Sequence, residues 1–470
     1  MRNHKMRLKI LLVVCITLQF TTIEKTFSQI KLPSVFCNNM VLQQRSDVPI
    51  WGWDAPGNEL TIKTSWDTTT VKVRCANTAF WKTTLKTPSA GGPYTITIKG
   101  SDEQTLSNVM IGEVWICSGQ SNMEMNSTWG IKKGDEEVKN ADYPNIRFFS
   151  IKKIANESRQ INCYGKWEEC TPATMKNFSA AGYFFGKQLQ DSLKVPIGLI
   201  NISWGGAPAE CFINKELITN DYTLTANARK LKEYPWWPSL IGGIYNAMIY
   251  PIIPYQIAGA IWYQGESNVT TANGYNKLLK TLIENWRSDF GKNFPFYFVQ
   301  IAPYTYEKDI NAAFLREAQL KSLEVPNTGM VVTTDLVDNI KDIHPKDKKS
   351  VGIRLANLAL SDHYGIKGII CKSPVYKSMK IEKNRIRIFF DNVPTKLISK
   401  NGAPSCLEIA GEDHKFVPAQ GVIDKNTLVV FTKDIKNPVA VRFSFTSDSM
   451  GNLFSKEGLP ISPFRTDNWN

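Results

Sequence analysis

Histidine is scarce in this sequence. The 470 residues include four, His4, His344, His363 and His414. The nine cysteines form no Cys-x-x-Cys pair and have no histidine neighbours, which argues against a zinc site. Lysine and arginine are scattered among acids, without the basic block that suits a phosphate backbone, and no apolar run is long enough to span a bilayer. We therefore expect no metal, no cofactor, no nucleic-acid partner and no membrane span.

Residues 1–28 have the features of a secretory signal peptide. Arg2, Lys5, Arg7 and Lys9 precede an apolar run at 10–20, and small residues place the cut near 28. Of the formal charge of +13, this leader carries +4, which leaves +9 for the remaining chain. We expect an exported protein, periplasmic or extracellular.

In an oxidising compartment, two of the remaining cysteines could form a disulfide. Cys163 and Cys170 are close enough in the sequence to close a short loop. The other cysteines fit buried small hydrophobes.

The hydrophobic pattern divides the chain into three parts. Short β-type runs separated by turn residues fill 29–106, which predicts an antiparallel β-sandwich domain. Strands alternate with helical segments over 107–366, a pattern typical of a parallel sheet covered by helices. Short strands return over 367–470, which predicts a C-terminal β-rich domain of sandwich type. The fold class is therefore α/β, with β regions on both sides.

Ligands of such sheets bind at the carboxyl ends of the strands, so the residues that follow each strand are the candidates for a site. Four polar clusters occupy these positions: 118–122, 203–207, 264–268 and 335–344. Ser121 follows a strand that ends in a glycine, which is how a nucleophilic hydroxyl is presented. The spacing departs from the Gly-x-Ser-x-Gly elbow, because Met123 stands at the second glycine.

Only one histidine suits a catalytic base. His363 lies at the end of the last predicted helix of the α/β region, and His414 lies in a charged turn of the C-terminal β region. His344 alone follows a strand of the α/β region. The sequence therefore predicts that Ser121 attacks an ester carbonyl while His344 accepts its proton. The oxyanion would be held by the backbone N–H of Ser121, by that of Gly205 or Gly206, and by the Gln264 amide.

Four blocks together resemble the sialate O-acetylesterase family within the SGNH hydrolases. They are Gly119-Gln-Ser-Asn-Met123, Trp204-Gly-Gly206, Ile261-Trp-Tyr-Gln-Gly-Glu-Ser-Asn268 and Asp342-Ile-His-Pro345. The resemblance implies a flavodoxin-like α/β/α catalytic domain and a metal-independent esterase that removes acetyl groups from sugar hydroxyls. It implies Ser121 as nucleophile, His344 as base and Gln264 as oxyanion donor.

One position departs from that family's Asp-x-x-His block, because Lys341 stands where the acid belongs. Asp342 is the nearest substitute, and Asp335 or Asp338 could also orient His344. A Ser-His pair held by a backbone carbonyl is the remaining alternative.

Two functions of other classes stay open from the sequence. Glu124 and Glu266 could form the carboxylate pair of a glycoside hydrolase. The aromatic run that contains Trp236 and Trp237 could stack on sugars in a glycan-binding protein without catalysis, or serve an esterase as a substrate site together with Asn122. The acetylated sugar is also open, with acetylated xylan and pectin as alternatives to sialic acid.

Overall fold

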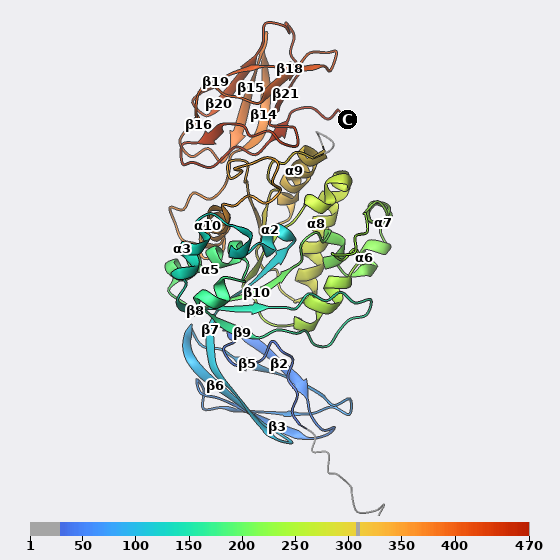
Figure 1. The fold of residues 1–470 in the computed structure, drawn as a ribbon, viewed down its shortest axis with the longest axis vertical. Helices are drawn as coiled ribbons and strands as arrows, with labels where there is room; N and C mark the ends of the chain where they lie inside the picture. Colours follow the sequence, from blue (N-terminus) through green and yellow to red (C-terminus); the bar gives the residue numbers. More distant parts are fainter. Residues whose placement is uncertain (1–28, 307–310, 470) are drawn as a thin grey trace, which may run out of the picture.

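The structure, a computed structural model, describes residues 29–306 and 311–469. Three parts follow one another along the long axis, with a β-rich N-terminal part, a middle α/β part and a β-rich C-terminal part (Figure 1). The predicted signal peptide, 1–28, lies outside the described residues.

The middle part is built on a sheet of strands in the order β13-β12-β11-β7-β10-β8-β9. Neighbouring strands are parallel except β9, which runs antiparallel to β8. The predicted parallel sheet is confirmed. Its strands are β7 (Glu103–Gly119), β8 (Tyr143–Ser150), β9 (Trp167–Cys170), β10 (Ile197–Ser203), β11 (Gly259–Tyr263), β12 (Phe296–Val299) and β13 (Thr328–Val331).

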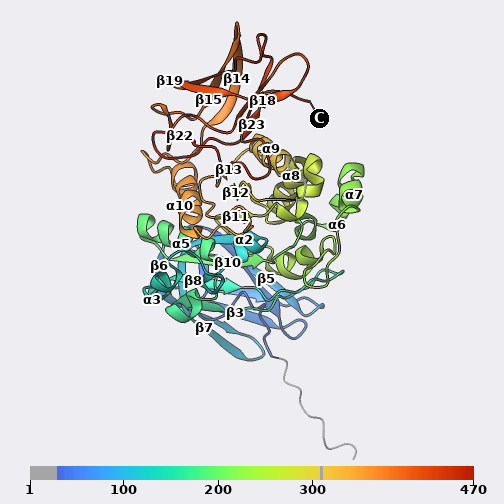
Figure 2. The same cartoon turned by 45° about the horizontal axis from the view of Figure 1, so that its top comes forward.

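Alternate residues of these strands pack on two separate hydrophobic clusters, as the two-residue period of a strand requires. Val114 and Ile116 of β7 pack with α8 (Ala272–Asp289) and α9 (Asn311–Lys321). Trp115 and Cys117 pack on the other face with α5 (Ala180–Leu193) and α10 (Lys348–Leu358). Figure 2 shows these two pairs of helices on opposite sides of the sheet. The covering of both faces explains why the central strands read as continuous apolar runs.

Strand β7 joins the N-terminal part to the middle part without a linker. Its first half pairs antiparallel with β6 (Gly91–Lys99), and residues 110–112 pair with β1 (Val41–Gln43). Its second half lies between β10 and β11. The domain boundary predicted between 106 and 107 therefore falls inside a single strand, and its position rests on the sequence pattern alone.

The two outer parts consist of short strands. The N-terminal part adds β2 (Asp47–Trp53), β3 (Glu59–Thr64), β4 (Thr70–Arg74) and β5 (Phe80–Lys86). The C-terminal part contains the sheets β14-β15-β20-β19 and β18-β17-β21-β23 and the pair β16-β22. Their bounds are β14 (Val375–Glu382), β15 (Arg385–Asp391), β16 (Leu397–Ser399), β17 (Leu407–Ala410), β18 (Phe416–Pro418), β19 (Gln420–Asp424), β20 (Thr427–Phe431), β21 (Ala440–Phe443), β22 (Leu453–Ser455) and β23 (Phe464–Arg465).

The remaining helices are short and lie in the connections. They are α2 (Ser121–Glu124), η1 (Ser127–Trp129), α3 (Gly134–Lys139), α4 (Pro172–Met175), η2 (Ala209–Phe212), α6 (Lys215–Thr219), α7 (Tyr222–Ala228), η3 (Tyr245–Ile249), η4 (Tyr250–Ile252), η5 (Glu266–Thr271), η6 (Ser322–Glu324) and η7 (Ala359–His363). No helix of the described chain combines the length and the apolar character needed to cross a membrane.

The disulfide proposed between Cys163 and Cys170 is not formed, because both residues are free thiols. The fold gives the reason. Cys163 belongs to the hydrophobic cluster on the α8 face of the sheet, whereas Cys170 belongs to the cluster on the α5 face. Residues that are near in sequence thus pack in two different hydrophobic clusters.

Gly119 allows the close contact between the ends of β7 and β11. Its φ is +134°, and a Cβ atom there would lie 2.1 Å from the Tyr263 carbonyl oxygen. Gly119→Ala should therefore lower the free energy of unfolding by about 3 kcal/mol or more, since backbone strain and a backbone collision add. Urea denaturation would measure this change.

Gly130→Ala is the matched control, because Gly130 also has a positive φ, of +81°, but no neighbouring atom within 4 Å of the added Cβ. Equal losses for the two variants would contradict the close-contact explanation.

Candidate active site

The carboxyl ends of three central strands are hydrogen-bonded to one another. The Trp204 N–H, after β10, donates to the Gly119 carbonyl at the end of β7, at 3.0 Å. The Gln120 N–H donates to the Tyr263 carbonyl at the end of β11, also at 3.0 Å. The polar clusters that follow these strands are therefore held side by side, and Ser121 begins helix α2 between them.

Ser121 is half-buried and lies against the backbone of Gly205. A Cβ atom at Gly205 would come within 3.4 Å of the Ser121 Cβ. Because Ser121 is the first residue of α2, its own N–H has no partner within the helix. The loop after β10 thus meets the start of α2 at the predicted nucleophile.

Glu124, at the end of α2, accepts a hydrogen bond from the Gly205 N–H. Its Oε2 accepts that N–H at 2.6 Å, and its Oε1 pairs with Lys153. The prediction of Gly205 as an oxyanion donor is therefore corrected. The neighbouring Gly206 N–H makes no hydrogen bond to the described part of the chain, so of the two glycines it is the one available to a substrate.

Gln264 does not face the substrate side either. Its side chain is fully buried, its amide nitrogen donates to Asn268 Oδ1 at 2.8 Å, and its Oε1 accepts the Tyr275 hydroxyl at 2.7 Å. Both ends of the amide are engaged within the protein. The expected oxyanion role of Gln264 is thus replaced by one of bracing the loop after β11.

Asn122 is likewise internal, which corrects its prediction as a substrate-binding residue. It is fully buried, and its Nδ2 donates to Glu266 Oε1 at 2.5 Å and to the Ile343 carbonyl at 3.1 Å. Its Oδ1 accepts from Lys348 Nζ at 2.5 Å. Asn122 therefore ties α2 to the loop after β11, to the loop that carries His344, and to the start of α10.

His344 has the properties of an available base. Its Nε2 is buried and has no hydrogen-bond partner among residues 29–306 and 311–469. Burial lowers the pKa of the imidazole, and the charge of Lys348 lowers it further, against the opposing effects of Asp342 and Glu124. The neutral form therefore persists to lower pH than in an ordinary histidine. The ring contacts Trp129 edge to face, with centroids 5.7 Å apart.

Of the three acids considered for orienting His344, Asp342 is the nearest that the structure records. Its Oδ1 accepts the His344 backbone N–H at 3.0 Å and lies 3.7 Å from Nδ1. Asp335 is held by Arg354 in two hydrogen bonds of 2.8 and 2.6 Å, and Asp338 is exposed. Asp342 fixes the loop backbone, and its carboxylate stops just short of a hydrogen bond to the ring.

The two other described histidines lie elsewhere. His363 packs against Trp115 at the end of η7, and His414 stacks on Trp469 in the C-terminal part. Only His344 is joined to the start of α2.

The two carboxylates considered for a glycosidase serve other purposes. Glu124 is paired with Lys153 and Gly205, as described above. Glu266 is 9% exposed, hydrogen-bonded to Asn122, and burial raises its pKa. Each acid holds part of the scaffold, which does not match a pair facing a glycosidic bond.

The predicted aromatic residues form a cluster beside Gly206. A Cβ atom at Gly206, whose φ is +77°, would lie 2.2 Å from the Trp237 ring. Trp237 packs on Tyr234 at 4.3 Å, and the neighbouring Trp236 is 67% exposed. The exposed Trp236 indole thus adjoins Trp237, which lies against Gly206, and the Gly206 N–H makes no hydrogen bond to the described residues.

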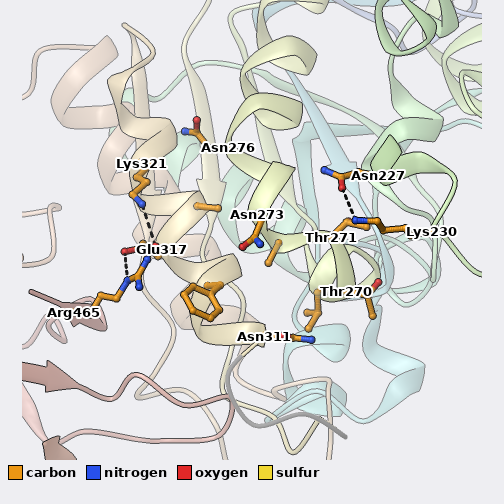
Figure 3. A pocket seen from close by; sticks show the side chains of 14 residues that line it. Asn227, Lys230, Thr270, Thr271, Asn273, Asn276, Asn311, Glu317, Lys321 and Arg465 are labelled. Atoms are coloured by element: carbon orange, nitrogen blue, oxygen red, sulfur yellow. Dashed lines mark hydrogen bonds and ion pairs between the residues drawn. The ribbon is translucent and has the colours of Figure 1, made fainter. Parts of the chain in front are cut away.

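A separate polar cavity of about 540 Å³ lies between α7, α8, α9 and the end of β23 (Figure 3). Glu317 of α9 joins Arg465 and Lys321 along one side, at 2.9 and 3.1 Å. Neither Ser121 nor His344 lines this cavity. It is therefore not part of the candidate site.

Comparison with known proteins identifies the family. A family model described as carbohydrate esterase, sialic acid-specific acetylesterase, matches residues 111–361, more than half of the chain. The chain belongs to this family. It is therefore a carboxylic-ester hydrolase of the carbohydrate esterases, and the suspected resemblance is confirmed.

The relatives of this esterase match it over most of their length. Human sialate O-acetylesterase is 30% identical over 393 residues, covering 75% of this chain and 74% of its own. The mouse enzyme of the same name is 27% identical and covers 89% and 90%. A crystal structure of a carbohydrate acetylesterase from Xanthomonas citri superposes with a TM-score of 0.85 at 33% identity, covering 94% of this chain and all of that one.

Sequence reasoning missed two residues of this esterase's site. Lys348 lies four residues after His344, and nothing in a run of lysines indicates that one of them is fully buried. Glu124 was considered only as a glycosidase acid, although its three-residue spacing from Ser121 places it on the same short helix. The signal that could have found both residues is their closeness in sequence to the catalytic candidates, four residues from His344 and three from Ser121.

Replacing Asn122 by alanine should destabilise the esterase by about 3 kcal/mol or more, because Glu266 and Lys348 would both lose a buried partner. Chemical denaturation measures the loss. Asn273→Ala, at an exposed asparagine of α8, is the control and should leave stability unchanged. An Asn122 variant as stable as this control would show that the buried network contributes little.

Proposed function

We propose that the chain is an exported carbohydrate O-acetylesterase in which Ser121 is the nucleophile and His344 the general base. One observation carries this proposal: His344 Nε2 is buried, has no hydrogen-bond partner in the described part of the chain, and lies in a loop that Asn122 ties directly to the Ser121 helix. A base that has no competing partner among the described residues, in a loop tied to the helix that the serine begins, can activate that hydroxyl.

In the first step, Ser121 Oγ attacks the carbonyl carbon of the acetyl ester. His344 Nε2 accepts the serine proton, and a new Ser121 Oγ–carbon bond forms. The tetrahedral intermediate then collapses. The sugar oxygen leaves and takes the proton back from His344, so that an acetyl-serine remains.

In the second step, water replaces the sugar. His344 Nε2 takes a proton from the water as it attacks the acetyl-serine, acetate is released, and the proton returns to Ser121 Oγ. Asp342 would support the positive charge that His344 acquires in both steps, since its Oδ1 is 3.7 Å from Nδ1.

The negative oxygen of both intermediates would be stabilised by two backbone donors. The Ser121 N–H belongs to the first residue of α2 and has no partner within the helix, and the Gly206 N–H has no acceptor among the described residues. Each such donor contributes roughly 3 to 4 kcal/mol to transition-state stabilisation.

The substrate class follows from the relatives and the aromatic cluster. Proteins called sialate O-acetylesterase match most of the chain, so a 9-O-acetylated sialic acid is the first candidate. Trp236 and Trp237 beside Gly206 offer ring faces on which a sugar could stack. Acetylxylan and acetylated pectin are alternatives with the same chemistry. Acetate release from a panel of the three substrates would distinguish them.

Ser121→Ala and His344→Ala should each reduce the hydrolysis of an aryl acetate about ten-thousandfold, because each removes a group that acts as part of one unit. The circular dichroism spectra of both variants should match that of the wild type, which would show that folding is unchanged. Ser118→Ala is a matched control for the serine, since Ser118 Oγ is buried and donates to the Ile202 carbonyl. Activity near that of the wild type in either catalytic variant would refute the mechanism, and in Ser121→Ala it would favour another reaction class.

The acid behind His344 can be identified by comparing two variants. Asp342→Asn should lower kcat by about tenfold or more, because it removes the charge beside the imidazolium. Asp335→Asn should lower stability and leave kcat largely intact, because Asp335 pairs with Arg354. The opposite pattern would assign the role to Asp335. No loss in either variant would mean that His344 acts without an acid.

A further inference from the structure

Lys348 is an unusual residue for its position. It is fully buried, it is the first residue of α10, and no carboxylate of the described chain lies within ion-pair distance of its Nζ. A cation is disfavoured both by burial and by the positive end of a helix dipole. A lysine kept in such a place calls for an explanation.

Its contacts are specific. Nζ donates to Asn122 Oδ1 at 2.5 Å and lies 5.1 Å from the centre of the Tyr263 ring. A protonated lysine can only donate hydrogen bonds, so in this form it fixes which end of the Asn122 amide faces it. The Nδ2 end must then face Glu266 and the Ile343 carbonyl, the residue before His344.

We propose that Lys348 is a positioning residue of the esterase, which orients the Asn122 bridge between the Ser121 helix and the His344 loop and whose charge keeps His344 neutral. This inference rests on the proposed function. It assigns two separable tasks to one side chain, because the orientation needs a hydrogen-bond donor and the electrostatic effect needs a charge.

The charges around the two groups support the second task. Burial lowers the pKa of Lys348 to about 7, against Glu266, Asp342 and Asp347, which raise it. Below that pH Lys348 is cationic, in the range where His344 would otherwise become protonated. Among the described residues, Lys348 is the cation that lowers the pKa of His344, against the acids Asp342 and Glu124. The lysine thus extends the neutral form of the base toward lower pH.

Two substitutions separate the tasks. Lys348→Gln keeps a donor for Asn122 but removes the charge, whereas Lys348→Met removes both. Lys349→Gln is the matched control, because it removes a positive charge at the adjacent residue. Lys349 is exposed and pairs with Glu137 at 2.7 Å. Solvent screens a charge at that position.

The first readout is the pKa of His344, which an NMR titration measures independently of activity. Lys348→Gln and Lys348→Met should both raise it by about half a unit or more, as expected when one nearby partly buried charge is removed. Lys349→Gln should not change it. In the wild type, His344 should titrate below the usual range of histidine, and a normal or raised value there would by itself overturn the electrostatic task.

The second readout is the pH profile of aryl acetate hydrolysis. The acid limb should move to higher pH in both Lys348 variants, while kcat at the optimum should fall by about tenfold more in Lys348→Met than in Lys348→Gln, because only the former leaves Asn122 Oδ1 unpaired.

An unchanged His344 pKa in Lys348→Gln would overturn the electrostatic task, and equal kcat values would overturn the orienting task. Failure of the proposed function is distinguishable from both, because Ser121→Ala would then retain activity whatever the His344 pKa.

Discussion

The site depends on one amide, that of Asn122. Its hydrogen bonds to Glu266, the Ile343 carbonyl and Lys348 join α2 to two distant regions of the sequence, the loop after β11 and residues 343–348. Because the Ser121 helix has a single turn, it cannot hold its own position by helix propensity. The neighbouring asparagine supplies the missing anchor. This network favours one orientation of the amide, since turning it over would place the Nδ2 donor against Lys348 and the Oδ1 acceptor against the Ile343 carbonyl.

The same network accounts for two ionisable groups in the interior. Glu266 and Lys348 are both buried and are bridged by Asn122 without touching each other. Compared with apolar residues of the same shape, such an arrangement adds little to stability, because the cost of removing two charges from water offsets their attraction. Removing one member is nevertheless costly, because a buried charge then loses its partner. Perturbed ionisable groups gather at functional sites, and here they surround the candidate base. The charge of Lys348 lowers the pKa of His344, and this effect needs no contact with a substrate.

Much of the fold could be predicted from the sequence, because central strands buried on both faces leave long apolar runs. Strand β10 is such a run, with six of its seven residues buried. The first half of β7 lacks this signal, since Glu103 to Asn108 is largely polar and partly exposed, without the apolar run that marks the second half. The disulfide failed for a related reason. Closeness in sequence says nothing about which face of a sheet a cysteine occupies.

The candidate site was predictable at the level of strand ends and not at the level of hydrogen bonds. Strand ends follow from the alternation of elements, which brings Ser121, Gly206 and His344 to one edge. The partners of Gly205, Gln264 and Asn122 depend on side chains from other loops, and Glu124, Asn268 and Lys348 take up these groups. Amides that look available in a sequence are thus used to hold the loops together, whereas the Gly206 N–H makes no hydrogen bond to the described residues.

The central claim is that Ser121 carries the acyl group during turnover. Its most direct test is to treat the protein with a phosphonate ester that mimics the tetrahedral intermediate and to map the modified peptide by mass spectrometry. The account predicts stoichiometric inactivation, with the phosphorus bound to Ser121. Inactivation with the label on another residue, or full activity after labelling of Ser121, would contradict it.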